Sequence, residues 1–268
     1  MKKEKIVHKL LLDTKTKIPF PSAQLTITQP AIEDIALIGE NNFFIAINML
    51  TKEYKNEIVK DNSDLDSLTN FDIIMSIIRE KTENSRLIFT SIFQLFELIL
   101  PDYKFSVTPS SFIFFDKEVA EGGNPQPHII DSKNFDEFAQ ILYEMFGVAS
   151  MTGEITHDYN PAGDRARALV EKFKKKHELL AQLKKEKGED TAVASIFGRY
   201  MNILAVGERK SKNDLKQYSV YQLIEEFKRF ELKEAFDYTI QAKMAGATKI
   251  KDAKDWMQDI TLGTNSEE

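Results

Sequence analysis

The spacing of the apolar residues constrains the fold of this chain more than any other feature of its sequence. Over most of the length they recur at the three- and four-residue intervals of an amphipathic helix, as among the isoleucines of residues 73–78. The interval falls to two over residues 103–107, which is the period of a strand. Glycine (11) and proline (8) are scarce, so few residues interrupt the helices. We therefore predict an α+β protein that is predominantly α-helical.

Local signals set the expected elements of the first half. Residues 18–29 alternate in period two after two prolines and predict one edge strand. A helix is expected to begin at Thr69 as the cap, and residues 86–100 predict an interior helix that is apolar almost all round. Strands are expected on both sides of the turn at 108–111 and again at 128–130. A helix should then begin after a cap at Asp131 or Ser132.

The second half differs in composition, which predicts a second domain. We expect a mixed helical domain with a small antiparallel hairpin or meander over residues 1–148, and a helical domain over residues 149–268. The latter should contain a long helix to residue 187, a helix over 192–206, a polar linker, and a pair of helices over 220–245. That pair, with Trp256, predicts only a slim hairpin core, so a partner surface is expected there.

Residue types that carry common enzyme chemistry are missing or scattered. There is no cysteine, the four histidines stand far apart without metal-ligand spacing, and no glycine-rich phosphate loop or nucleophile elbow occurs. We therefore assign no catalytic, cofactor-binding or metal-binding residue, and predict a protein that is not an enzyme. The longest apolar run, 87–100, is too short to cross a bilayer, and no targeting segment is present, so we expect a soluble protein without a membrane partner.

Charge is distributed unevenly along the chain. The formal net charge is −6, yet residues 165–187 carry nine bases and three acids, a net charge of +6. Such a stretch is typical of a solvated helix face, and it is also typical of a docking surface for an acidic protein or nucleic acid. Nucleic-acid binding is the weaker hypothesis, because nucleobases stack on aromatic side chains and only one aromatic residue, Phe173, lies in the stretch. The candidate partner-binding residues are Arg165, Arg167, Lys172, Lys175, Lys176, Phe230 and Trp256.

The C-terminal stretch resembles a family of phage proteins. Residues 218–260 read YSVYQLIEEFKRFELKEAFDYTIQAKMAGATKIKDAKDWMQDI. This stretch is similar to the end of virion-assembly proteins encoded in the tail modules of contractile-tailed phages of Gram-positive hosts. Those proteins also join an aromatic-rich YQL…F.RF helix to a helix that ends in Ala-Gly-Ala and a closing Trp-Met-x-x-Ile.

Two earlier stretches, IPFPSAQLTI and LTNFDIIMSII, are similar to the baseplate hub and assembly-catalyst proteins of T-even-type phages, and HIIDSKNFDEFAQIL also resembles such proteins. The resemblance implies a non-enzymatic tail or baseplate protein that binds other tail proteins, located in the virion or in the host cytoplasm during assembly. It also implies no catalytic residues. Two alternatives stay open: a tail assembly chaperone absent from the mature particle, and a nucleic-acid-binding protein that uses the basic helix 165–187. A homo-oligomer is compatible with each.

Overall fold

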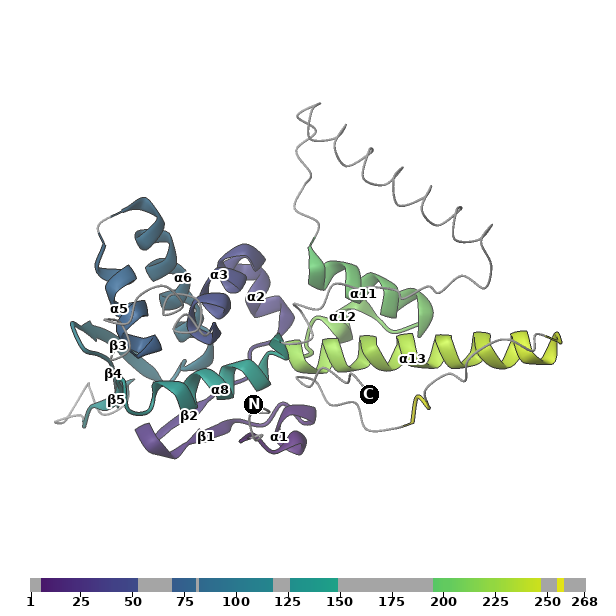
Figure 1. The fold of residues 1–268 in the computed structure, drawn as a ribbon, viewed down its shortest axis with the longest axis horizontal. Coiled ribbons are helices and arrows are strands. Elements are labelled where there is room, and N and C mark those ends of the chain that lie inside the picture. Colours follow the sequence, from purple (N-terminus) through teal and green to yellow (C-terminus); the bar gives the residue numbers. More distant parts are fainter. Residues whose placement is uncertain are drawn as a thin grey trace, which may run out of the picture. The chain divides into compact units, whose positions relative to one another are not determined.

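The computed structural model describes residues 6–52, 69–80, 82–117, 126–148, 195–246 and 255–257 (Figure 1). Within these residues the chain is predominantly α-helical with two small antiparallel sheets, which confirms the predicted fold class. Contacts between residues divide the chain into two units. The first unit comprises Met1–Ser150, Ser211–Ile224 and Thr261–Glu268, and the second comprises Met151–Lys210 and Glu225–Ile260. The division into domains 1–148 and 149–268 stays a prediction.

The first unit contains both small sheets and most of the described helices. The N-terminal elements are α1 (Lys9–Asp13), β1 (Ile18–Phe20), the 3-10 helix η1 (Pro21–Ala23), β2 (Leu25–Ile27), α2 (Ile32–Ile38) and α3 (Glu40–Thr51). The central elements are α5 (Asn70–Arg79), α6 (Glu83–Ile99), β3 (Tyr103–Thr108), β4 (Ser111–Asp116), β5 (His128–Ile130) and α8 (Phe135–Met145). The C-terminal contribution is α12 (Lys212–Leu215) and the beginning of α13 (Val220–Met244).

The N-terminal strand region is a hairpin. β1 and β2 pair antiparallel, with Ile18 opposite Ile27, so the prediction of one strand over residues 18–29 is wrong. The chain reverses at Gln24, which has the left-handed φ of 54° that closes η1. Such a φ is uncommon outside glycine and has no signal in an alternating pattern.

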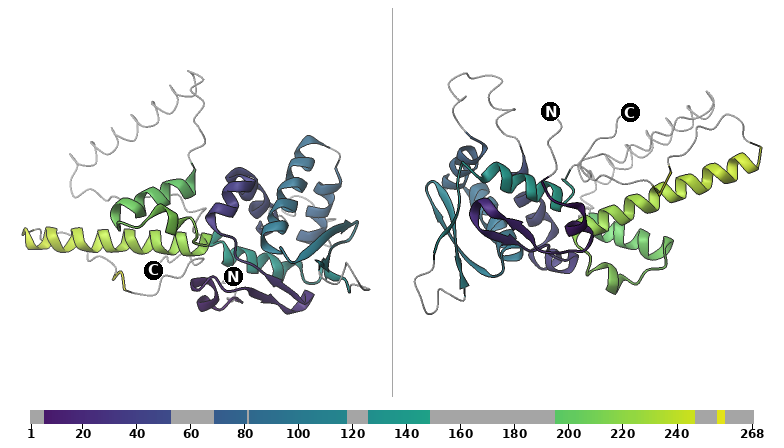
Figure 2. Two further views of the ribbon diagram at one scale, coloured as in Figure 1. Left: turned by 180° about the vertical axis from the view of Figure 1, so that it is seen from behind. Right: turned by 90° about the horizontal axis from the view of Figure 1, so that it is seen from below.

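Three further strands form an antiparallel sheet in the order β3-β4-β5, as the period-two pattern predicts. Tyr103 lies opposite Asp116, and Phe112 lies opposite Ile130. The helices of the first unit lie on one side of this sheet (Figure 2). Alternate residues of β3 are therefore half-buried and exposed, with Lys104 on the exposed face.

Helix α5 begins as its sequence predicts. The Thr69 hydroxyl accepts a hydrogen bond from the Asp72 backbone N–H at 3.2 Å, and the Asp72 carboxylate accepts from the Thr69 backbone N–H at 2.9 Å. This reciprocal capping box satisfies two backbone donors. The helix that follows, α6, is not interior on all sides, because Leu87 and Phe93 are exposed. Its polar residues form a face that is open to solvent, although the stretch is predominantly apolar.

An aromatic core fills the space between α6 and the three-stranded sheet. The Phe96 ring, buried to 1% exposure, lies 4.9 to 5.9 Å from four other rings. These rings belong to Phe105, Phe112, Phe114 and Phe138. Edge-to-face geometry dominates, which is the arrangement that the ring quadrupole favours.

Helix α8 binds the N-terminal segment through a buried acid. Glu144, buried on α8, accepts backbone hydrogen bonds from Ile6 at 3.1 Å and Val7 at 2.9 Å, which holds the N-terminal segment. Helix α8 itself begins after Asn134, so the predicted cap at Asp131 or Ser132 is wrong. The Asp131 carboxylate instead accepts from the Lys133 backbone N–H at 2.9 Å within the preceding turn.

The segment 211–224 completes the first unit. The Ile32 backbone N–H donates to the Tyr218 carbonyl at 3.0 Å, and Ala31 pairs with Ser219 in an antiparallel bridge. The Gln222 side chain donates to the Asp13 carbonyl at 2.7 Å. The predicted polar linker thus contains a helix, α12, and forms part of a packed unit.

The second unit contains α11 (Ile196–Gly207) and most of α13. The predicted helix over 192–206 corresponds to α11, which begins later, after its cap Ser195. The predicted pair of helices over 220–245 is wrong, because α13 continues without a break to Met244. No glycine or proline interrupts it before Gly246, so helix propensity favours continuity. The predicted long helix to residue 187 lies outside the described residues.

Candidate partner-binding surfaces

The predicted partner-binding residues fall into two groups. Arg165, Arg167, Lys172, Lys175 and Lys176 lie outside the described residues. Phe230 and Trp256 are described, and both belong to the second unit.

Phe230 packs within the second unit. A Cβ at Gly207, the last residue of α11, would lie only 2.4 Å from Cζ of the Phe230 ring. Only glycine leaves room for this approach, so the ring fixes how closely α11 and α13 pack. Tyr200 and Phe227 stack beside it with ring centroids 4.2 Å apart. Phe230 is half-buried, so part of the ring is open to solvent.

Trp256 is half-buried and is held through its main chain. Its carbonyl oxygen accepts from Nη1 of Arg229 at 3.0 Å, while Nη2 of the same arginine donates to Glu225 at 2.6 Å. The guanidinium of Arg229 therefore connects α13 to the tryptophan.

A polar cluster lies at the end of α11. Nζ of Lys210 is 3.3 Å from the Glu208 carboxylate and also pairs with the Glu226 carboxylate. Burial raises the pKa of Glu208, and the neighbouring Glu226 carboxylate raises it further, against the opposing effect of Lys210. Lys210 thus pairs with both carboxylates. The sequence offers no signal for the cluster, because Glu226 lies 16 positions from Lys210 and tertiary packing brings it there.

The C-terminal half of α13 carries exposed apolar residues. Beyond Phe227 no described residue of this helix is buried. Leu232, Phe236, Ile240 and Met244 follow at four-residue intervals and so lie along one side of the helix. Leu232 and Phe236 are half-buried, whereas Ile240 is 42% exposed and Met244 83%. We call these four residues the α13 stripe. The predicted hairpin core that would cover Phe236 and Ile240 is absent from the described part of the chain, because no second helix of a pair forms there.

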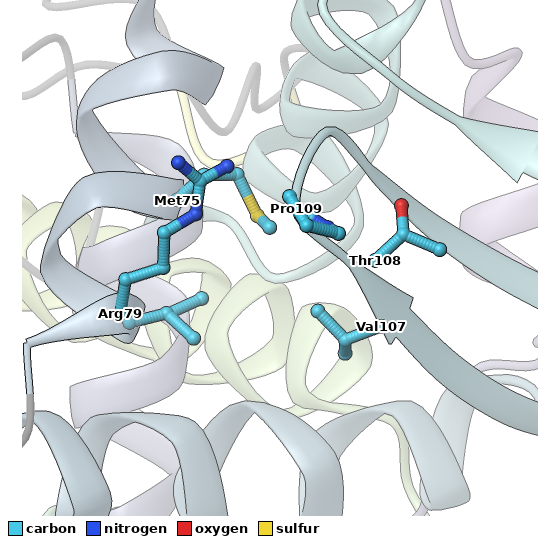
Figure 3. Close-up of a pocket in the computed structure, with 6 residues that line it drawn as sticks. Met75, Arg79, Val107, Thr108 and Pro109 are labelled. Carbon is cyan, nitrogen blue, oxygen red and sulfur yellow. The ribbon is translucent and has the colours of Figure 1, made fainter.

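A groove in the first unit lies between the end of α5 and the β3–β4 turn (Figure 3). Its volume is about 460 Å³, and its lining is apolar apart from Thr108 and the guanidinium of Arg79. The Thr108 hydroxyl already pairs with Ser111 at 2.7 Å. The amphipathic spacing of the isoleucines of residues 73–78 predicts that they share a buried face, whereas the structure leaves Ile78 half-exposed at the groove. The signal in the sequence that could have indicated the groove is a helix face that stays apolar to its last turn.

Residues with metal-binding side chains do not cluster in the described part of the chain. No group of three or more His, Asp or Glu side chains there is placed to hold a metal ion. His128 is held between two acceptors, the Ala23 carbonyl and the Asp116 carboxylate, each at 3.2 Å, so its role in the fold is to tie β5 to η1 and β4. Among the described helices, none has the length and apolarity that a bilayer span requires.

Comparison with known proteins relates the C-terminal region to a phage protein. Residues 194–261 match the model of a family described as the YomV second domain, which derives from Bacillus phage SPBc2. The match covers a quarter of the chain and includes α11, α12 and α13. A comparison with curated proteins and one with solved structures each gave no match. Residues 194–261 are thus similar to a phage-derived domain, and they contain the stretch 218–260 whose resemblance to phage proteins the sequence indicated.

Proposed function

We propose that the chain is a non-enzymatic phage protein of the tail or baseplate that acts by binding other tail proteins, through the α13 stripe above all. The similarity of residues 194–261 to a phage-derived domain supports a phage protein. The resemblance of several stretches to tail and baseplate proteins supports the finer assignment. The protein then acts in the virion, or in the host cytoplasm while the tail assembles.

The α13 stripe, with Ile240 and Met244 exposed at its end, is the observation that carries this proposal. A helix that presents apolar residues at four-residue spacing fits a groove or a second helix on a partner. Phe230 belongs to the same helix, where it packs against Gly207 of α11, and Trp256 is bonded to Arg229 of that helix. Both are candidates for the edge of the contact.

Affinity capture from infected cells tests the proposal. The tagged full chain is expected to recover tail or baseplate subunits, and Ile240→Asp with Met244→Asp should reduce their yield at least ~10-fold by placing charges in an apolar contact. Leu37→Asp is the matched control, since Leu37 of α2 is 86% exposed and lies in the first unit. Recovery of metabolic proteins alone, or equal yields from both variants, would contradict the proposal.

Mass spectrometry of purified virions separates the two assembly roles. A structural component is present at a stoichiometric copy number, whereas a tail assembly chaperone is absent from the mature particle. Light scattering of the purified chain, run alongside, shows whether it forms a homo-oligomer.

The basic stretch 165–187 motivates one competing function, nucleic-acid binding. Binding through this stretch must weaken steeply as salt concentration rises, because each neutralised phosphate releases a counterion. A salt titration with double-stranded and single-stranded DNA measures this slope. A steep slope together with no recovered tail protein would favour the competing function.

A further inference from the structure

The outer edge of β3 has backbone groups that no strand satisfies in the described part of the chain. β3 ends the order β3-β4-β5. The Lys117 backbone N–H donates to the Asp102 carbonyl at 3.0 Å, which identifies the hydrogen-bonded register between β3 and β4. Pairs alternate in an antiparallel ladder, so the backbone groups of Phe105 and Val107 point away from β4. The Tyr103 N–H points the same way and donates to Leu100.

The groove between α5 and the β3–β4 turn adjoins this edge. Val107 belongs to both, because its backbone faces the open edge while its side chain lines the groove with Met75 and Pro109 (Figure 3). A chain that paired with β3 would therefore place a side chain next to an apolar cavity of about 460 Å³. Peptides that add a strand to a sheet edge obtain affinity from the main chain and specificity from such pockets.

Positive charge marks the path of such a chain. The Arg79 guanidinium lines the groove, and no hydrogen bond or ion pair joins it to another described side chain. Lys104, exposed on β3, is likewise without an ion pair among the described residues. A second copy of this chain would bring the same cations to the edge, whereas an acidic partner would neutralise them.

We propose that β3 and this groove bind an extended acidic–apolar segment of a partner protein. The segment adds a strand next to β3, inserts an apolar side chain between α5 and Pro109, and pairs a carboxylate with Arg79. This site belongs to the first unit and does not depend on the α13 stripe or on the proposed tail function.

Panning a yeast-displayed library of random linear peptides against the full chain tests the proposal. The recovered peptides are expected to alternate apolar and polar residues, with Asp or Glu next to an apolar residue. A recovered peptide, synthesised with a fluorophore, should bind Arg79→Glu at least ~10-fold more weakly than wild type, because a charge-assisted hydrogen bond is lost. Arg199→Glu is the matched control, since Arg199 is an exposed arginine of the second unit, and it should change affinity less than ~2-fold.

The strand pairing has a test of its own that leaves the protein unchanged. N-methylation of the alternate peptide residues whose N–H groups face β3 should weaken binding at least ~10-fold, and N-methylation of the other alternate residues should not. Val107→Pro is the complementary variant on the protein side. It removes the N–H that faces the open edge and should weaken peptide binding, and proline is tolerated at such a position of an edge strand.

Failure to recover any peptide, or equal binding to wild type and Arg79→Glu with no effect of N-methylation, would overturn the proposal. Self-association that Val107→Pro abolishes, without peptide binding, would assign the edge to a second copy and would also overturn it.

Discussion

The two units bury their helices to very different extents. All twelve of the largest fully buried side chains among the described residues belong to the first unit. In the described part of the second unit the buried apolar residues are only Phe197, Tyr200, Leu204 and Phe227. Buried apolar area is the main stabilising contribution in folding, so the first unit is stabilised by its own core. The described helices of the second unit have little of this stabilisation and leave the apolar side chains of Ile240 and Met244 exposed.

Truncation of the central ring of the first unit should have the largest effect. Phe96→Ala removes a ring that contacts four others and is expected to destabilise the protein by ~3–5 kcal/mol. Urea unfolding monitored by circular dichroism measures the loss. Phe93→Ala on the same helix, where the ring is 36% exposed, should cost much less. Equal losses would mean that the core is not centred on Phe96.

A methyl group at the helix contact of the second unit should have the next largest effect. Gly207→Ala places a Cβ 2.4 Å from the Phe230 ring and is expected to destabilise the α11–α13 contact by ~1–3 kcal/mol, although alanine favours helix. Hydrogen exchange of the α11 amides reports this contact specifically. The double variant with Phe230→Ala removes the clash, so it should be less destabilised than the sum of the two single changes. Strict additivity would show that the two residues do not meet.

The capping box of α5 should contribute less. Asp72→Ala removes the reciprocal cap and is expected to cost ~1 kcal/mol. Hydrogen bonds from Thr69 lower the pKa of Asp72 below its ordinary 3.8, so the carboxylate stabilises the fold above that pH. The contribution is lost as pH falls through the lowered pKa, and the difference in urea midpoint between wild type and variant should shrink there. A difference that persists in strong acid would contradict this cause.

The polar cluster of the second unit should show the smallest effect, with the opposite pH dependence. Because burial raises the pKa of Glu208 above 4.5, ionisation opposes folding, and the wild type loses stability as pH rises from 4.5 through the raised value. Glu208→Gln avoids this loss. The variant should equal or exceed wild type at pH 7 by less than ~1 kcal/mol, since the side chain is partly solvated and also pairs with Lys210. A marked loss at pH 7 would mean that the ion pair outweighs the burial.

The sequence predicted elements whose cause is local. The capping box at Thr69 and the strand β5 follow from side chains within a few residues, and both lie where the pattern placed them. The predictions were wrong where a single backbone torsion reverses the chain, as at Gln24. They were also wrong where one helix continues through a predicted break, as in α13.

The candidate sites were harder to predict from the sequence than the local elements. Phe230 and Trp256 were identified as apolar residues of a slim region, but the close approach of Gly207 to Phe230 requires two helices to be placed. The groove beside Arg79 joins residues more than 25 positions apart. No spacing rule connects an α5 arginine with the turn at Pro109, because tertiary packing alone brings them together.

The sharing of α13 between the two units limits where recombination within such a gene leaves a folded protein. The matched family begins at residue 194, yet Tyr221 and Leu223, which lie within it, are buried in the first unit. A recombination event at that boundary would transfer these residues without α2, whose beginning is bonded to Tyr218. Exchange of the C-terminal module between related genes therefore requires that the recipient conserve a matching surface at α2, so the two parts must diversify together.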